Sequence, residues 1–121
     1  MSKWIEAAER ALALVEKETD IPYRFELFLE QVEQLPDTYI VYFLVSAPTV
    51  SSADNKERAY QPHIQVSLFY RNIRSFLTVP DQIIAAFANE GFRRAGEGRI
   101  PYQPNTGHYG WRCDFNFYEM R

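Results

Sequence analysis

The chain has 121 residues, of which 46% are hydrophobic and 24% charged, as is usual for one globular domain with its own core. A formal net charge of −3 argues against a nucleic-acid-binding protein, because such proteins usually carry a basic face. The segment MSKWIEAAER lacks the apolar core of a signal peptide, and no apolar run approaches the roughly 18 residues of a membrane span. We therefore expect a single soluble domain over residues 1–121, made in a cytoplasm.

A helix is predicted from Ser2 to Glu18, with Ser2 as its N-cap, because a serine hydroxyl can accept a backbone N–H of the first turn. Its apolar residues recur at every third or fourth position and form one stripe: Trp4, Ile5, Ala8, Leu12 and Val15. Asp20 and Pro22 then end the helix, since the residue before a proline disfavours helical backbone. Residues Tyr23–Glu30 largely alternate between apolar and polar side chains, which predicts a half-buried strand.

Two further strands are predicted between residues 38 and 71. Residues Thr38–Val45 are apolar at nearly every position, which is typical of a central strand covered on both faces. In the segment Tyr60–Arg71, apolar residues alternate with polar ones from Ile64 to Tyr70, so they share one face. Between these strands, Ser46–Ala59 is small, polar and charged, and we expect a long exposed loop. Loops of this length usually have a function.

The second helix is predicted to begin at Thr78, with Pro80 in its first turn and Gly91 as the stop after its last turn. Its apolar stripe consists of Ile83, Ile84, Phe87 and Ala88. Several proline, asparagine and glycine residues predict turns from Glu97 to His108, and a final strand follows from Tyr109 to Glu119. The predicted order is therefore helix, three strands, helix and strand.

The stretch GHYGWRCDFNFYEM contains His108, Cys113 and Asp114, the side-chain types of a cysteine hydrolase. Alternation along the final strand places Cys113 on the apolar face with Trp111 and Phe115, and Asp114 on the opposite face. Burial raises the pKa of a thiol and leaves little thiolate. We therefore interpret Cys113, the only cysteine, as a structural residue rather than a nucleophile.

No other group of residues has the spacing of a catalytic or metal site. His63 is expected on a polar strand face and His108 in a solvated turn, and neither has a zinc-binding motif. Glu26 and Glu30 share a strand face but lie roughly 13 Å apart, beyond the usual reach of a glycosidase pair. A small basic cluster follows the second helix: Arg93, Arg94 and Arg99. We expect no enzyme activity, no cofactor and no metal, and a basic cluster that is solvated or contacts an acidic neighbour.

Four segments carry a resemblance to a known family. They are Pro36–Tyr42, Ile64–Tyr70, Gly91–Phe92 and Tyr102–Tyr109, the last with the pattern Y-x-P-x-T-G-x-Y. In this order the chain resembles the small tail terminator, or tail completion, proteins of long-tailed bacteriophages. The resemblance implies an α+β fold, helix-β-β-β-helix-β, in which a mostly antiparallel four-stranded sheet has two helices packed on one face.

The resemblance also implies a structural role in the virion. Such proteins form a ring, usually a hexamer, that caps the tail tube and provides the surface that the head joins. The implied partners are other copies of the chain, the tail tube and head-completion proteins, with no membrane and no nucleic-acid sequence recognition. Opposite charges in the loop 46–59 suit contacts between copies. The candidate interface residues are Ser51, Asp54, Asn55, Lys56, Glu57 and Arg58.

Two other classes of protein remain open at this point. A small monomeric inhibitor or immunity-type binding protein would also have an aromatic-rich α+β domain of this size. A cysteine-dependent enzyme would require a reactive thiol at Cys113. The three hypotheses differ in self-assembly, in the number of partners and in the accessibility of the thiol.

Overall fold

The computed structural model describes residues 3–26, 35–46, 49–51, 58–117 and 119–120. Its elements are α1 (Lys3–Thr19), β1 (Tyr23–Phe25), β2 (Thr38–Ser46), β3 (Thr49–Ser51), β4 (Arg58–Tyr60), β5 (His63–Tyr70), α2 (Ile73–Asn89), β6 (Phe92–Gln103), β7 (His108–Phe117) and β8 (Glu119–Met120).

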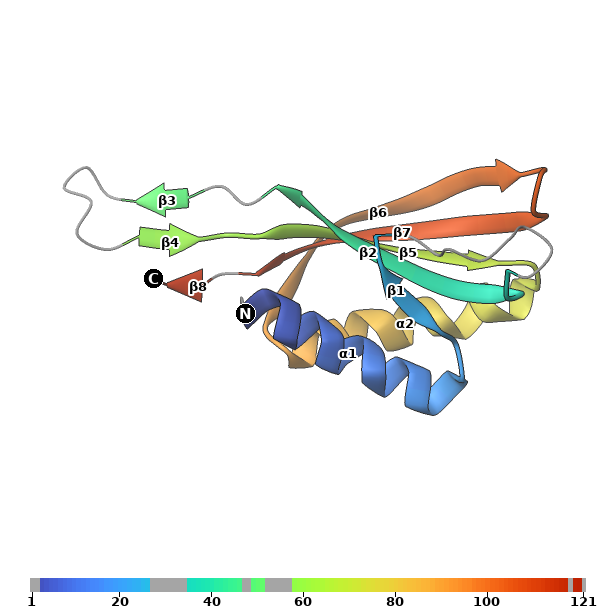
Figure 1. Cartoon of the computed structure of the whole chain (residues 1–121), viewed down its shortest axis with the longest axis horizontal. Coiled ribbons are helices and arrows are strands. Elements are labelled where there is room, and N and C mark those ends of the chain that lie inside the picture. The colour runs from blue at the N-terminus through green and yellow to red at the C-terminus, as the bar shows by residue number, and fades with distance from the viewer. Residues whose placement is uncertain (1–2, 27–34, 47–48, 52–57, 118, 121) are drawn as a thin grey trace.

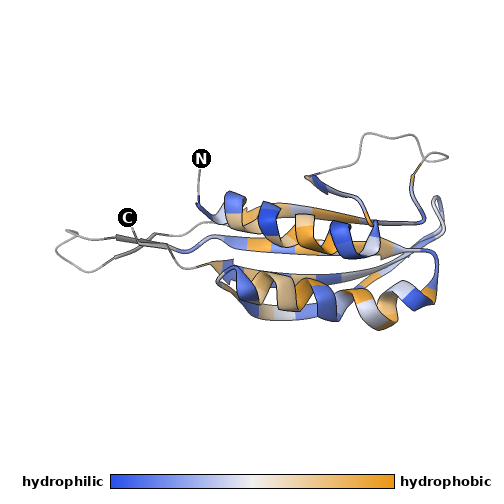
Figure 2. Ribbon diagram, turned by 90° about the horizontal axis from the view of Figure 1, so that it is seen from below, coloured by the Kyte–Doolittle hydropathy of each residue, from blue (hydrophilic) through white to orange (hydrophobic). Residues whose placement is uncertain are grey.

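A five-stranded sheet with both helices on one face forms the body of the described structure (Figure 1). Its strand order is β1-β2-β5-β7-β6, and every neighbouring pair is antiparallel except β1 with β2. Figure 2 shows the two helices side by side across the sheet. The α+β class, the mostly antiparallel sheet and the position of the helices agree with the prediction. The predicted count of four strands is wrong, because the sheet has five.

The core lies between the helices and the sheet. The apolar stripe predicted for α1 is confirmed, since Trp4, Leu12 and Val15 are buried against the sheet layer. The alternate residues of β5 predicted to share one face are also buried: Ile64, Val66, Leu68 and Tyr70. Burying a large apolar side chain contributes about 1.5–3 kcal/mol to stability, so these two stripes account for much of the attachment of α1 to the sheet.

The first strand is shorter than predicted. It ends at Phe25, because Glu26 adopts a positive φ of 73°, a conformation that leaves the extended region. The Glu26 N–H still donates to the Tyr42 carbonyl at 2.8 Å, so the chain stays attached to β2 at this point. Residues 27–30 of the predicted strand lie outside the described residues.

The strand β2 is covered on one face rather than two. Ile40 and Tyr42 point toward the helices and are buried. Tyr39, Val41 and Phe43 alternate with them and remain partly exposed, since in the described ranges both helices lie on the other face of the sheet (Figure 1). The expectation of a second covering layer is therefore not met by any element that the structure describes.

Two short parts of the segment predicted as an exposed loop, Ser46–Ala59, belong to a second small sheet. Strands β3 and β4 pair as an antiparallel hairpin, and β8 near the C-terminus adds to the other side of β4. This three-stranded sheet extends beyond the body at one end of the molecule (Figure 1). The predicted loop thus contains β3 and the start of β4, whereas its residues 47–48 and 52–57 lie outside the described residues. The pairing of β4 with β8 joins segments that are far apart in the sequence.

The helix α2 begins earlier than predicted. Asn72 is the N-cap, and its side-chain oxygen accepts the backbone N–H of Arg74 at 2.9 Å. Pro80 therefore lies inside the helix, where it cannot donate an interior hydrogen bond; its ring is buried. The prediction of Thr78 as N-cap is wrong, whereas the stop at Gly91 is confirmed by its φ of 92°.

The strand β6 occupies much of the segment predicted as turns. It runs for 12 residues through Gly96, Gly98 and Pro101 to the turn before His108. An edge strand tolerates glycine and proline, because the outward side of its backbone needs no partner within the sheet. The register of β6 on β7 shifts after Arg94 and again after Ile100, so the strand is irregular where these residues occur. This is the strand missing from the prediction.

Replacing Gly110 should destabilise the protein, because β6 and β7 approach closely there. A Cβ at position 110 would lie 2.6 Å from the Cβ of Ile100, and neither atom can rotate away from the backbone. We expect Gly110→Ala to lower the free energy of unfolding by about 1–3 kcal/mol in urea denaturation. Gly96→Ala is the matched control, since nothing lies within 4 Å of its Cβ position. Equal stability of the two variants would contradict this packing argument.

Candidate functional site

The only cysteine is part of the core. Cys113 lies on β7 with 0% exposure, and burial, with a smaller effect from Glu97, raises the pKa of its thiol to about 12. Its Sγ is 3.8 Å from the backbone carbonyl oxygen of Asp114. The thiol is therefore protonated at neutral pH and inaccessible to a substrate. The burial agrees with its predicted position on the apolar face of the strand.

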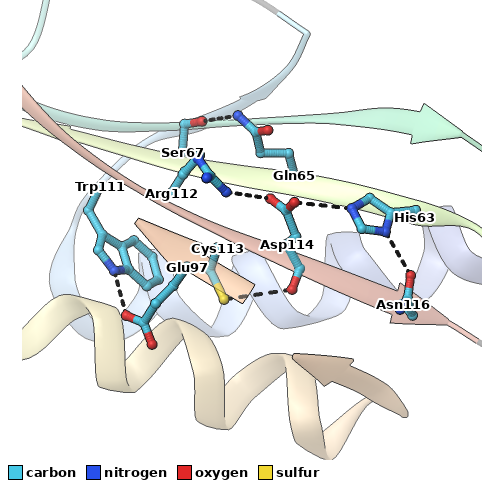
Figure 3. Close-up of polar contacts among 9 residues, drawn as sticks. All are labelled: His63, Gln65, Ser67, Glu97, Trp111, Arg112, Cys113, Asp114 and Asn116. Atoms are coloured by element: carbon cyan, nitrogen blue, oxygen red, sulfur yellow. Dashed lines mark hydrogen bonds and ion pairs between the residues drawn. The ribbon is translucent and has the colours of Figure 1, made fainter. Parts of the chain in front are cut away.

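Glu97 and Trp111 lie beside Cys113 (Figure 3). Glu97 is the cross-strand partner of Cys113, and its carboxylate accepts the indole N–H of Trp111 at 3.0 Å. The same carboxylate forms an ion pair with Arg94 at 2.9 Å. Both oxygens of Glu97 thus have hydrogen-bond donors, and the carboxylate fixes the orientation of the indole at the rim of the core.

A chain of polar side chains lies on the opposite face of the sheet, across β5 and β7 (Figure 3). His63 Nε2 is 3.2 Å from the Asp114 carboxylate, and His63 Nδ1 is 2.8 Å from the Asn116 side-chain oxygen. Arg112 donates to the other Asp114 oxygen at 3.3 Å. Both ring nitrogens of His63 thus have hydrogen-bond partners on β7. The position of His63 on the polar face is as predicted, and the network joins β5 to β7.

His108 is buried, so its predicted place in a solvated turn is wrong. Its Nε2 donates to the Pro36 carbonyl at 2.9 Å, and its ring packs edge-on against Tyr39. Burial lowers its pKa below the ordinary value of 6.5; the hydrogen bond to Pro36 opposes this with a smaller effect, and the nearby Arg71 adds a smaller lowering. This hydrogen bond joins His108 to Pro36, which precedes it by 72 residues in the sequence, and the imidazole is buried. Sequence periodicity contains no signal for such a contact.

The predicted interface loop is only partly within the described residues. Ser51 and Arg58 are register partners on β3 and β4, so the structure brings them together. The other four candidates, Asp54, Asn55, Lys56 and Glu57, lie outside the described residues. The role of this segment in subunit contact stays a prediction.

The basic cluster lies along β6, an outer strand of the main sheet. Arg94 pairs with Glu97, and Arg99 stacks over the ring of Phe76 at 4.9 Å from its centroid. Arg99 also donates to the Tyr70 hydroxyl at 3.4 Å. The sequence pattern indicates that these arginines come after the second helix. It does not indicate that they lie along a sheet edge, because the glycines between them are also typical of turns.

A shallow groove of about 560 Å³ lies between the end of α1, the start of β2 and the first half of α2. Its lining is mostly polar and includes charges of both signs, Asp20, Asp37 and Arg74. Ligand pockets are usually enclosed and mainly apolar, so this groove is not a preformed small-molecule site. Among the residues that the structure describes, no three His, Cys, Asp or Glu side chains are grouped to hold a metal ion.

None of the helices in the described part of the chain combines the length and apolar character needed to cross a bilayer.

Comparisons with known proteins give a structural match without a sequence match. No protein-family model matches the chain, and neither does any curated protein sequence. Among solved structures, the chain is similar to a chain from the virion of a native gene transfer agent particle, with a TM-score of 0.56 and 11% sequence identity. The match covers 96% of this chain and 93% of that one. The two chains therefore share one fold from end to end.

Thiol labelling should test the burial of Cys113. We expect native protein at pH 8 to react with a thiol reagent at least about 100-fold more slowly than protein unfolded in guanidinium, because the thiolate is scarce and shielded. A matched control is Ala95→Cys combined with Cys113→Ala, which moves the thiol to an exposed position on β6 and should label quickly. Rapid labelling of native Cys113 would revive the cysteine-enzyme hypothesis.

The burial of His108 predicts how stability depends on pH. Its folded-state pKa is lowered, so the unfolded chain binds a proton first as the pH falls below about 6.5. We therefore expect the free energy of unfolding to decrease as the pH falls from 7.5 toward 5.5. His108→Gln should show a smaller decrease, whatever its stability at pH 7.5. The same decrease in both proteins would contradict the assignment to His108.

Proposed function

We propose that this chain is a non-enzymatic structural subunit of a phage-like virion. Within the virion we assign it the role of a tail terminator or tail completion subunit, which forms a ring that caps the tail tube and joins it to the head. The observation that carries the proposal is the end-to-end likeness of its fold to a chain of a gene transfer agent virion. The motif from Tyr102 to Tyr109 supports the more specific role.

The contacts of the cysteine and of the two histidines favour a structural role over an enzymatic one. The Cys113 thiol is buried, both nitrogens of His63 are hydrogen-bonded, and His108 is enclosed by Pro36 and Tyr39. The contacts of these groups are with other parts of the fold, as expected for residues with a structural role. The chemistry that remains accessible in the described residues is that of surfaces, namely charged edges, a sheet face and a projecting hairpin.

The small sheet formed by β3, β4 and β8 supports assembly. It extends away from the main body at one end of the molecule (Figure 1). Edge strands present unpaired backbone groups, which can hydrogen-bond to another chain. A projection of this kind suits a subunit that reaches toward neighbouring proteins of a virion.

The molar mass in solution tests the proposal. Chains of 14.2 kDa should associate with rising concentration toward a closed ring, which for a hexamer has a mass of about 85 kDa by light scattering. Negative-stain images of the associated fraction should show rings, and the rings should bind isolated tail tubes. A strict monomer at high concentration that binds one unrelated protein tightly would instead support the inhibitor or immunity-type hypothesis.

A further inference from the structure

We propose that neighbouring copies of this chain associate through the two opposite edges of the main sheet, which carry opposite charges. The basic edge is the strand β6, with Arg93, Arg94, Glu97 and Arg99. The acidic edge is the side of α1 and β1 farthest from β6, with Glu9, Glu16, Asp20, Arg24 and Glu26. The inference rests on the proposed self-assembly and names the surfaces that produce it.

The basic edge is long and accessible. The strand β6 ends the sheet, and among the described strands only β7 pairs with it. Its three arginines are exposed and outnumber the single Glu97. A side chain added at Gly96 would meet nothing within 4 Å, so β6 is uncovered on that side. The outer side of β6 thus combines positive charge with an open backbone.

The acidic edge lies at the other end of the sheet. The Glu9 carboxylate accepts the hydroxyl of Tyr23 at 3.1 Å and also that of Tyr42, which places this side of α1 beside β1. Glu16 follows Glu9 by seven residues, about two turns of α1, so it lies on the same side of the helix. The exposed Asp20 precedes β1 and the exposed Glu26 follows it.

Charge is therefore segregated between the two edges. Four carboxylates accompany one cation, Arg24, on the acidic edge, whereas three arginines accompany one carboxylate on the basic edge. Like charges brought together at an interface are unfavourable, so two basic edges or two acidic edges would repel each other. Opposite edges attract, and each copy offers one of each. This is the arrangement of a heterologous contact, which closes into a ring when the rotation between copies permits.

The inference assigns self-association to the sheet edges rather than to the segment from Ser51 to Arg58. The hairpin would then be available for a different neighbour at one end of the molecule, where Figure 1 places it. The contact is electrostatic in part, and interactions between exposed charges are screened over about 8 Å at physiological ionic strength. Association should therefore weaken as salt is added.

The test reverses the charge of each edge in turn. The basic-edge variant is Arg93→Glu with Arg94→Glu, and the acidic-edge variant is Glu16→Lys with Glu26→Lys. Each alone should raise the Kd of self-association at least about tenfold in sedimentation or light scattering. An equimolar mixture of the two variants should regain association, as should one chain that carries all four changes. Thermal unfolding of each variant verifies that it is folded.

A matched control for the basic-edge variant replaces two other basic residues by glutamate, so the net charge changes by the same amount. This control is Lys3→Glu with Lys17→Glu. Each lysine is seven residues, about two helical turns, from Arg10, so all three lie on the same side of α1. Arg10 forms an ion pair with Glu90 at the end of α2. These lysines thus lie on the side of α1 near α2, away from β1. The control should associate like the wild type.

Two outcomes separate the inference from the proposed function. If the wild type assembles and both edge variants assemble equally well, the edge contact is overturned while the ring proposal stands. If the wild type remains monomeric throughout the concentration series, the ring proposal and the edge contact are both overturned. Loss of assembly in both edge variants with recovery on mixing supports the edge contact.

Discussion

The antiparallel pairing of β5 with β7 determines which side chains are buried and which face the open side of the sheet. The register runs from His63 opposite Asn116 to Tyr70 opposite Tyr109. Because side chains alternate along both strands, this single register places Cys113 under the helices and Asp114 on the other face. A shift by one residue would expose the core and bury the polar network. The position of both helices therefore depends on this pair of strands.

The placement of both helices on one face decides what the molecule can offer to a partner. The core contains the buried apolar residues of α1, α2 and β5. The Cys113 thiol is part of this core, and the imidazoles of His63 and His108 form hydrogen bonds within the chain. The other face of the sheet keeps Tyr39, Val41 and Phe43 partly exposed. These side chains give the described part of the chain an open, partly apolar sheet face.

The sequence predicts the elements that local pattern defines and misses those that distant contacts define. The stripe of α1 and the alternation of β5 and β7 are local, and they were predicted correctly. The strand β6 was missed, because Gly96, Gly98 and Pro101 have the same composition in an irregular edge strand as in a series of turns. The pairing of β4 with β8 and the contact of His108 with Pro36 join segments far apart in sequence, where periodicity contains no information.

The charged edges were unpredictable for the same reason, although every one of their residues is visible in the sequence. Arg93 on β6 and Glu26 after β1 lie at opposite edges of the sheet because β1 pairs with β2 on one side and β6 pairs with β7 on the other. Within one copy, an exposed ion pair contributes at most about 1 kcal/mol, so folding alone gives little reason to separate the charges. Charges on opposite outer edges are too far apart to pair within one copy. The proposed contact is the arrangement in which they can pair, since the basic edge of one copy then faces the acidic edge of the next.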